Sequence, residues 1–203
     1  MKEVLITILR DKNTSITKFR KAAEGIAFIL AWQTASHLEK EQVSVDTPIT
    51  KAIGSKIKNN IILIPILRSA LSLVSPFLKV FNNAKVGFLG LKRDEKTFIP
   101  KIYYKNFPEI SSKDNVIILD PMIATGGSGS EAIKILKESG IKEEKIIFVA
   151  VISALVGIKK IKKEYPKVKI ICAQEDKELN DKMFIIPGLG DFGDRFFGTP
   201  QKI

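Results

Sequence analysis

The chain has 203 residues, of which 45% are hydrophobic and 27% are charged, and its formal net charge at pH 7 is +11. This length gives a single domain room for a substantial core, and the composition is typical of a globular protein and excludes a disordered one. No apolar run is long enough to span a membrane, and the charged N-terminus lacks the apolar core of a signal peptide, so we expect a soluble cytoplasmic protein.

The positive net charge favours a polyanionic partner, either nucleic acid or a phosphorylated small molecule. The chain has one cysteine, Cys172, and one histidine, His37. A single cysteine excludes an intrachain disulfide and a cysteine-based metal site, and its apolar surroundings predict a small buried residue. For His37, which lies on a predicted helix, we expect a structural or surface role.

The first predicted element is a long amphipathic helix. Thr14 and Ser15 offer an N-cap, and apolar residues recur at helical spacing from Phe19 to Leu38. Residues 43–53 alternate in polarity around Pro48, which predicts an edge strand or a projecting β-arm.

Apolar runs of strand length follow at residues 61–67, 86–91, 99–104, 116–119, 145–153 and 168–173. Helical patterns lie at residues 131–139 and from residue 154 to a point before Pro166. Strands that alternate with helices predict an α/β protein, a single domain over residues 1–203, with a mostly parallel central sheet flanked by helices.

The most informative stretch is residues 115–135. A buried strand ends at Asp120 and Pro121, a loop of small residues follows at 124–129, and a helix is predicted from residue 131. This order is typical of phosphate binding, because glycines let the backbone approach the ligand and the helix start offers unpaired N–H groups. Thr125 and Ser128 add hydroxyl donors, and Asp120 would lie at the carboxyl edge of the sheet, where ligands of open α/β folds bind.

Two commoner phosphate motifs do not fit this loop. A P-loop needs a lysine directly after its last glycine, and the dinucleotide-binding fingerprint needs a different glycine spacing. From the loop alone, a flexible connection without a ligand remains the alternative.

Two arginines follow predicted strands. Arg68 would lie at the same edge of the sheet, and Arg93 lies in a charged segment, residues 92–97. Each has an alternative role, Arg68 as a helix cap or surface ion pair and Arg93 as part of a charged hairpin tip.

The C-terminal segment, residues 184–199, holds four glycines and a proline among apolar residues. We expect no regular element there, but a loop whose backbone amides and carbonyls face a small flat ligand. Where such a ligand presents both donors and acceptors, backbone groups can bind it without ionisable side chains. A glycine-rich loop that only packs on the core is the alternative.

Residues 120–128, Asp-Pro-Met-Ile-Ala-Thr-Gly-Gly-Ser, resemble the phosphoribosyl diphosphate (PRPP) loop of uracil phosphoribosyltransferases. The resemblance extends from residue 14 to residue 199, and its further motifs are Phe19-Arg20, Pro65-Ile66-Leu67-Arg68, Arg93, the pattern Asp176-x-x-Leu179-Asn180 and the segment 184–199. The chain departs from the family pattern at Ser69-Ala70, Lys92, Lys96, Glu175 and Phe192.

The resemblance implies a type I phosphoribosyltransferase fold, with a small C-terminal hood at about residues 174–203 and a β-arm that contributes to a dimer contact. It also implies a mobile loop that begins at residues 92–97. The implied reaction is pyrimidine salvage, in which uracil and PRPP give UMP and pyrophosphate.

By the same resemblance, charge stabilisation comes from Arg68, Arg93 and Asp191, and no residue is assigned as a general acid or base. The implied PRPP-binding residues are Arg68, Arg93, Asp120, Pro121, Met122, Ile123, Ala124, Thr125, Gly126, Gly127, Ser128 and Asp191. The implied uracil-binding residues are Ile185, Gly190, Asp191 and Phe192. Mg²⁺ is implied as the cofactor, held through PRPP and water with no firm protein ligand.

Two other functions stay open. One is a phosphoribosyltransferase for another nucleobase, because Ser69-Ala70 and Phe192 alter the expected pocket. The other is an inactive PRPP- or nucleotide-binding regulatory protein that binds RNA, which the net charge of +11 favours. For the enzyme we expect a homodimer or homotetramer, a nucleotide effector such as GTP or CTP, and neither a membrane nor a nucleic-acid partner.

Overall fold

The computed structural model describes residues 1–93 and 100–200. The mobile loop implied for residues 92–97 therefore lies mostly outside the described residues, and so does Lys96. The side chain of Arg93 also lies outside them, although its backbone ends a strand.

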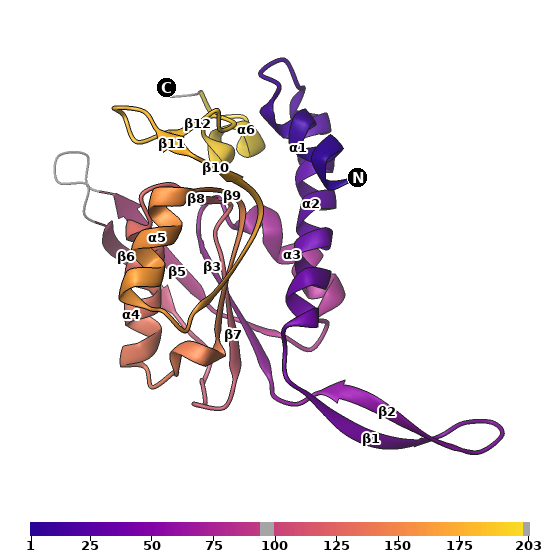
Figure 1. Ribbon diagram of the computed structural model, residues 1–203. Coiled ribbons are helices and arrows are strands. Elements are labelled where there is room, and N and C mark those ends of the chain that lie inside the picture. Colours follow the sequence, from indigo (N-terminus) through magenta and orange to yellow (C-terminus); the bar gives the residue numbers. More distant parts are fainter. Residues whose placement is uncertain (94–99, 201–203) are drawn as a thin grey trace.

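Within the described residues, a sheet of eight strands forms the centre of the molecule, with strand order β10-β9-β7-β3-β5-β6 (Figure 1). Two short strands complete it, β4 beside β3 and β8 beside β9. The strands are β3 (Ile61–Leu67), β4 (Lys85–Val86), β5 (Phe88–Arg93), β6 (Pro100–Asn106), β7 (Asn115–Leu119), β8 (Met122–Ile123), β9 (Ile146–Ala154) and β10 (Lys169–Asp176).

Neighbouring strands of this sheet are parallel, except that β6 runs antiparallel to β5. The predicted α/β fold with a mostly parallel sheet is confirmed. Because parallel strands end at one edge of a sheet, the residues after β3, β7 and β9 all lie at that carboxyl edge.

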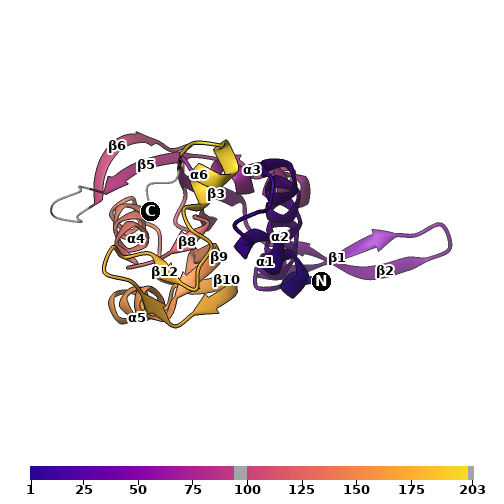
Figure 2. The same cartoon turned by 90° about the horizontal axis from the view of Figure 1, so that it is seen from above.

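Helices cover both faces of the sheet (Figure 2). One face packs against α1 (Lys2–Arg10), α2 (Ile16–Ser36) and α3 (Leu71–Val80), and the other against α4 (Gly127–Glu138) and α5 (Leu155–Glu164). A 3-10 turn, η1 (Glu143–Lys145), precedes β9. Each face has its own cluster of buried apolar residues, since side chains alternate between the two faces along every strand.

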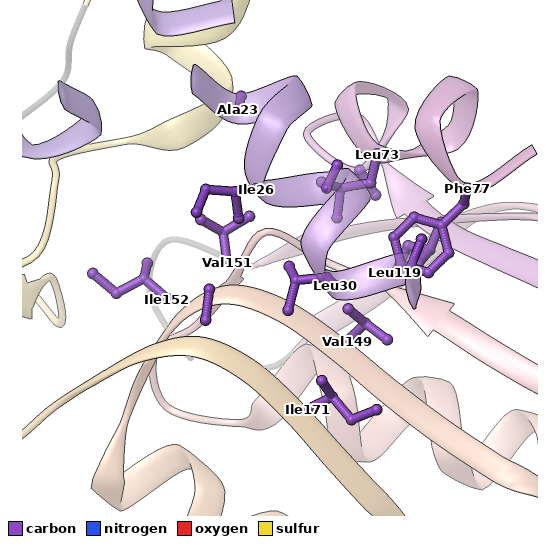
Figure 3. Packing of buried hydrophobic residues seen from close by; sticks show 14 of the residues in the cluster. Ala23, Ile26, Leu30, Leu73, Phe77, Leu119, Val149, Val151, Ile152 and Ile171 are labelled. Atoms are coloured by element: carbon purple, nitrogen blue, oxygen red, sulfur yellow. The ribbon is translucent and has the colours of Figure 1, made fainter. Parts of the chain in front are cut away.

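The predicted N-terminal helix is confirmed as α2. Ser15 caps it by accepting a hydrogen bond from the Lys18 backbone N–H (3.4 Å). Ile26 and Leu30 point into the cluster formed with β9 and α3 (Figure 3). His37 follows α2 on the exposed surface, as expected.

Strands β1 (Lys40–Asp46) and β2 (Lys51–Ile57) pair only with each other within the described residues, and they project from the body as an arm (Figures 1 and 2). This confirms the predicted β-arm. The side chains of Ile49 and Ile53 are 95% and 71% exposed.

Two predictions about regular structure are wrong. Helix α4 begins at Gly127, four residues before the predicted start, because the left-handed Gly126 (φ 78°) precedes it and a small residue is needed at Gly129. A β-carbon on Gly129 would lie 2.8 Å from Cδ1 of Ile161, so close packing of α4 on α5 selects glycine there.

The C-terminal segment is not entirely irregular. It contains β12 (Ile185–Ile186), which pairs with β11 (Glu178–Leu179), and helix α6 (Phe192–Phe197). Asp191 caps α6 at its start, and Gly198 (φ 80°) ends it in the left-handed conformation. These elements form a hood over the carboxyl edge of the sheet (Figure 1). In the described part of the chain, no helix has the length and apolarity to cross a membrane.

Candidate active site

The phosphate loop, residues 120–129, connects β7 to the first turn of α4. Two side chains of the loop contact its backbone: the Met122 N–H donates to Oδ1 of Asp120 (3.3 Å), and the Gly127 N–H lies 3.5 Å from Oγ1 of Thr125. The loop encloses a hollow of about 50 Å³, lined by Asp120, residues 122–129 and Phe148. The unpaired N–H groups at the start of α4 make this hollow suited to a phosphate group.

A second glycine, Gly157 of α5, fixes the back of the phosphate loop. A β-carbon on Gly126 would lie 2.7 Å from the Gly157 carbonyl oxygen, and one on Gly157 would overlap the Ala124 carbonyl oxygen. The backbones of the loop and α5 therefore touch, and neither tolerates a side chain. Sequence reasoning missed Gly157; its position in the first turn of a helix after a buried strand was the available signal.

The predicted PRPP residues of this loop divide into two groups. Asp120 and residues 122–128 line the hollow, whereas Pro121 is outside its lining and connects the loop to β9. The Pro121 carbonyl accepts hydrogen bonds from Val151 and Ile152 N–H groups (3.0 Å each), and the Ile123 side chain is buried in the core. Met122 is partly buried against the core on the opposite face.

Arg68 directly follows β3 at the same edge, and its side chain is exposed. Its carbonyl accepts from the Leu71 N–H (3.1 Å), which begins the turn into α3. In residues 1–93 and 100–200 its guanidinium forms no ion pair, so the ion-pair alternative has no support there. Ala70, where the family pattern has glycine, has right-handed torsions (φ −68°, ψ −11°) that any residue can adopt.

The turn after Arg68 meets the hood. A β-carbon on Gly193 would lie 3.4 Å from Cβ of Ser69. The predicted pyrophosphate-contacting turn and the C-terminal motif are thus brought together by the fold, although they are more than 100 residues apart in sequence.

The base loop, residues 185–192, contains the four predicted uracil residues. Two of them place their side chains in the core: Ile185 is 5% exposed and Phe192 is 1% exposed, with the Phe192 ring edge-on to Phe19 (5.2 Å). Any contact of these two with a base would therefore come from the backbone. Asp191 accepts from the Asp194 N–H (2.8 Å) and lies at the start of α6, next to Gly190.

An ion pair at the other end of the chain supports the base loop. Arg10 donates to both carboxylate oxygens of Asp176 (2.6 and 3.0 Å), and Asp176 is 5% exposed. Arg10 also donates to the Gly188 carbonyl (3.0 Å), while Gly188 N–H donates to Asp176 (2.9 Å). Sequence reasoning noted Asp176 as part of a motif but missed Arg10.

A second arginine, Arg195 of α6, reaches the same region. Its guanidinium donates to the carbonyls of Leu189 (2.9 Å), Asp11 (2.6 Å) and Leu9, and it lies over the Phe19 ring at 4.5 Å. Burial lowers the pKa of this guanidinium, and the charge of Asp11 opposes that effect. Arg195 was also missed, because nothing in its local sequence indicates which carbonyls it contacts.

The comparison with known proteins gives the chain a family. The uracil phosphoribosyltransferase family model matches residues 2–199, and the uracil phosphoribosyltransferase of Malacoplasma penetrans is 43% identical over 194 residues, covering 96% of this chain and 93% of that protein. The chain belongs to the uracil phosphoribosyltransferase family.

Solved structures agree with this assignment at the level of fold. A protein from Aquifex aeolicus has a TM-score of 0.89 at 35% identity, covering 100% of this chain and 96% of its own. A hypoxanthine-guanine phosphoribosyltransferase from Bacillus anthracis has a TM-score of 0.52 at 14% identity, covering 79% of this chain and 80% of its own. The type I phosphoribosyltransferase fold is thus confirmed.

Members of this family handle a diphosphate, for which magnesium is the natural partner. In the described residues, no group of three or more His, Cys, Asp or Glu side chains lies close enough together to hold a metal ion.

Proposed function

We propose that the chain transfers the 5-phosphoribosyl group of PRPP to uracil, giving UMP and pyrophosphate in pyrimidine salvage. One observation carries the proposal: in a chain of this family, the phosphate loop, Arg68 and the base loop lie along one edge of the sheet. That edge is where open α/β folds bind ligands.

The reaction needs no nucleophilic residue. The bond from C1′ of PRPP to pyrophosphate breaks, positive charge develops on the ribose, and N1 of uracil forms the new bond to C1′ while its proton passes to solvent. The protein contributes by holding the two reactants in line and by stabilising the charge of the leaving group.

Each part of the site has a proposed role. Residues 124–128 hold the 5′-phosphate through N–H groups and hydroxyls, and Asp120 lies near the ribose hydroxyls. Arg68 and Arg93 face the pyrophosphate, and Asp191 lies near PRPP. The backbone of Ile185, Gly190 and Phe192 faces the uracil.

Mg²⁺ is proposed as the cofactor, which would be held by PRPP oxygens and water with no firm protein ligand. When bound, it neutralises part of the charge of the leaving pyrophosphate.

The experiment is steady-state release of pyrophosphate from PRPP with Mg²⁺, using uracil beside cytosine, hypoxanthine, adenine and orotate. We expect turnover with uracil alone. Turnover with another base would keep the mechanism and change the substrate. Absence of turnover in a folded protein that binds RNA in a salt-dependent way would favour the regulatory alternative.

Self-association is proposed through the arm. Its side chains Val45, Ile49 and Ile53 are 44%, 95% and 71% exposed, and a two-stranded ribbon is marginally stable in water by itself. Sedimentation should therefore show a homodimer or homotetramer.

Regulation by GTP or CTP is a further proposal, tested by adding each nucleotide to the assay. A cytoplasmic location is proposed because PRPP and UMP carry charges that do not cross membranes unaided.

A further inference from the structure

Two successive carbonyl groups of the base loop accept hydrogen bonds from arginines. Arg10 donates to the Gly188 carbonyl (3.0 Å) and Arg195 donates to the Leu189 carbonyl (2.9 Å). Both arginines line one groove of about 380 Å³ between the base loop and the start of α2. Neither interaction touches the hollow of the phosphate loop.

The direction of these carbonyls determines the direction of two N–H groups. A peptide unit is planar, and in the trans form its C=O and N–H point in opposite directions. The peptide bonds after Gly188 and Leu189 are trans, since neither is among the cis bonds of the described chain. The Leu189 N–H therefore points away from Arg10, and the Gly190 N–H points away from Arg195.

These two N–H groups have no acceptor within residues 1–93 and 100–200. Leu189 is only 4% exposed, and Gly190 is half-buried. Buried N–H groups without an acceptor are rare in folded proteins, so an acceptor supplied by a ligand is the natural complement. The carbonyl oxygens of a pyrimidine are acceptors of this kind.

We propose that Arg10 and Arg195 are positioning residues that turn the N–H groups of Leu189 and Gly190 toward the base. This inference rests on the proposed function and adds to it the residues that set the direction of the base-binding donors. Neither arginine contacts the base itself.

The supports of the two arginines fit this role. Asp176 holds Arg10 with both carboxylate oxygens and also accepts from the Gly188 N–H, so the Gly188 backbone is bound through both of its polar groups. Gly188 has φ 58°, and a β-carbon there would overlap the Ile185 carbonyl oxygen. The ring of Phe19 lies under the Arg195 guanidinium and limits its movement.

The first test measures kcat and KM for Arg195→Met and Arg10→Met. We expect the KM for uracil to rise about tenfold or more, as for the loss of well-directed hydrogen bonds, while the KM for PRPP stays within about twofold. Arg195→Lys and Arg10→Lys, which keep the charge but lose the fork, should fall between wild type and the Met variants. Equal rises in both KM values would overturn the proposal.

Lys12→Met is the matched control. Lys12 lines the same groove and is exposed, and in the described part of the chain it contacts neither loop carbonyl. Its replacement removes one positive charge as the other variants do, so its KM for uracil should match wild type. A rise equal to that of Arg195→Met would mean that charge alone matters, and the proposal would be wrong.

The second test separates positioning from a purely structural role. In 2-thiouracil and 4-thiouracil, sulfur replaces one acceptor oxygen and accepts a hydrogen bond less well. In wild type, the thio group should raise the KM relative to uracil. If Arg195 directs the donors, this rise should be smaller in Arg195→Met and Arg195→Lys for one of the two analogues. Additive effects for both analogues in both variants would overturn the proposal.

The wild-type protein separates this inference from the function. Turnover with uracil establishes the function, and the ratio of the KM for uracil in each variant to that in wild type then decides the inference. If the wild type uses another base, the same ratio is measured with that base. A folded wild type that turns over no base overturns both.

Discussion

The phosphate loop and the base loop are built in different ways. The phosphate loop has several hydrogen bonds between neighbours in sequence, and others go to the adjoining strand β9. Asp120 accepts from the Met122 N–H, Thr125 lies by the Gly127 N–H, and the Gly126 carbonyl accepts from Ser130 (2.8 Å). The base loop is held by Arg10, which is 166 residues from Asp176 and 178 residues from Gly188.

This difference indicates which substitutions can change the structure of each loop. A change in the phosphate loop acts on the loop itself and on the adjoining strand β9, because its hydrogen bonds join residues within the loop or join the loop to β9. The base loop depends on α1 and on α6, so a change at the far end of the chain alters it without touching a substrate. Arg20 of α2 adds another such contact, donating to the Phe196 carbonyl in the hood (2.9 Å).

The largest effect is expected for Arg68→Ala, which acts beside the phosphate loop. If Arg68 faces the leaving pyrophosphate as proposed, loss of this charged donor should reduce kcat by about 10²–10³-fold. The side chain is exposed, so the melting temperature should change little. Steady-state kinetics and a thermal melt measure the two quantities.

Lys79→Ala is the control for Arg68→Ala. Lys79 lies on the following helix and pairs with Glu24 at the surface (3.3 Å), an interaction of small value. Its turnover should match wild type. Near-normal turnover of Arg68→Ala would remove Arg68 from the mechanism.

A smaller effect is expected for Gly126→Ala, which tests the contact between the phosphate loop and α5. Gly126 has φ 78° and its β-carbon would lie 2.7 Å from the Gly157 carbonyl oxygen. Displacement of the loop should raise the KM for PRPP about tenfold, and the left-handed torsion should cost about 1 kcal/mol or more of stability.

Gly140→Ala separates the two causes. Gly140 also has a positive φ (88°), but nothing lies within 4 Å of its β-carbon position. It should lose stability as Gly126→Ala does and keep the wild-type KM for PRPP. If both variants raise that KM equally, the contact with Gly157 is not what shapes the loop.

The smallest effect is expected at Cys172, on the strand that leads to Asp176. Burial raises the pKa of this thiol to about 11, from a model-compound value of 9.0. The folded state therefore holds the proton more tightly than the unfolded state, and the stabilisation is present below pH 9 and lost as the pH rises toward 11. Cys172→Ala should keep wild-type kinetics and remove this pH-dependent part of the stability, measured as the difference from wild type in urea melts. An unchanged difference across that range would contradict it.

Much of the fold was predictable from the sequence because the signals were local. Buried strands such as residues 116–119 are continuous apolar runs, and α2 has a long apolar stripe with a cap at Ser15. Helix α6 was missed although Asp191 and Gly198 mark its ends, because six residues give too little periodicity to detect. The early start of α4 was missed because glycines and serines disfavour helix until Phe148 and Ile161 pack against them.

The sequence by itself determined the family resemblance, the order of strand and helix patterns along the chain, the phosphate loop and the projecting arm. Each of these depends on residues that are adjacent in the chain. Only the tertiary structure decided which side chains of the base loop enter the core and which peptide groups it presents. Those depend on Arg10, Asp176 and Arg195, and hydrogen bonds between residues more than 160 positions apart leave no local pattern in a sequence.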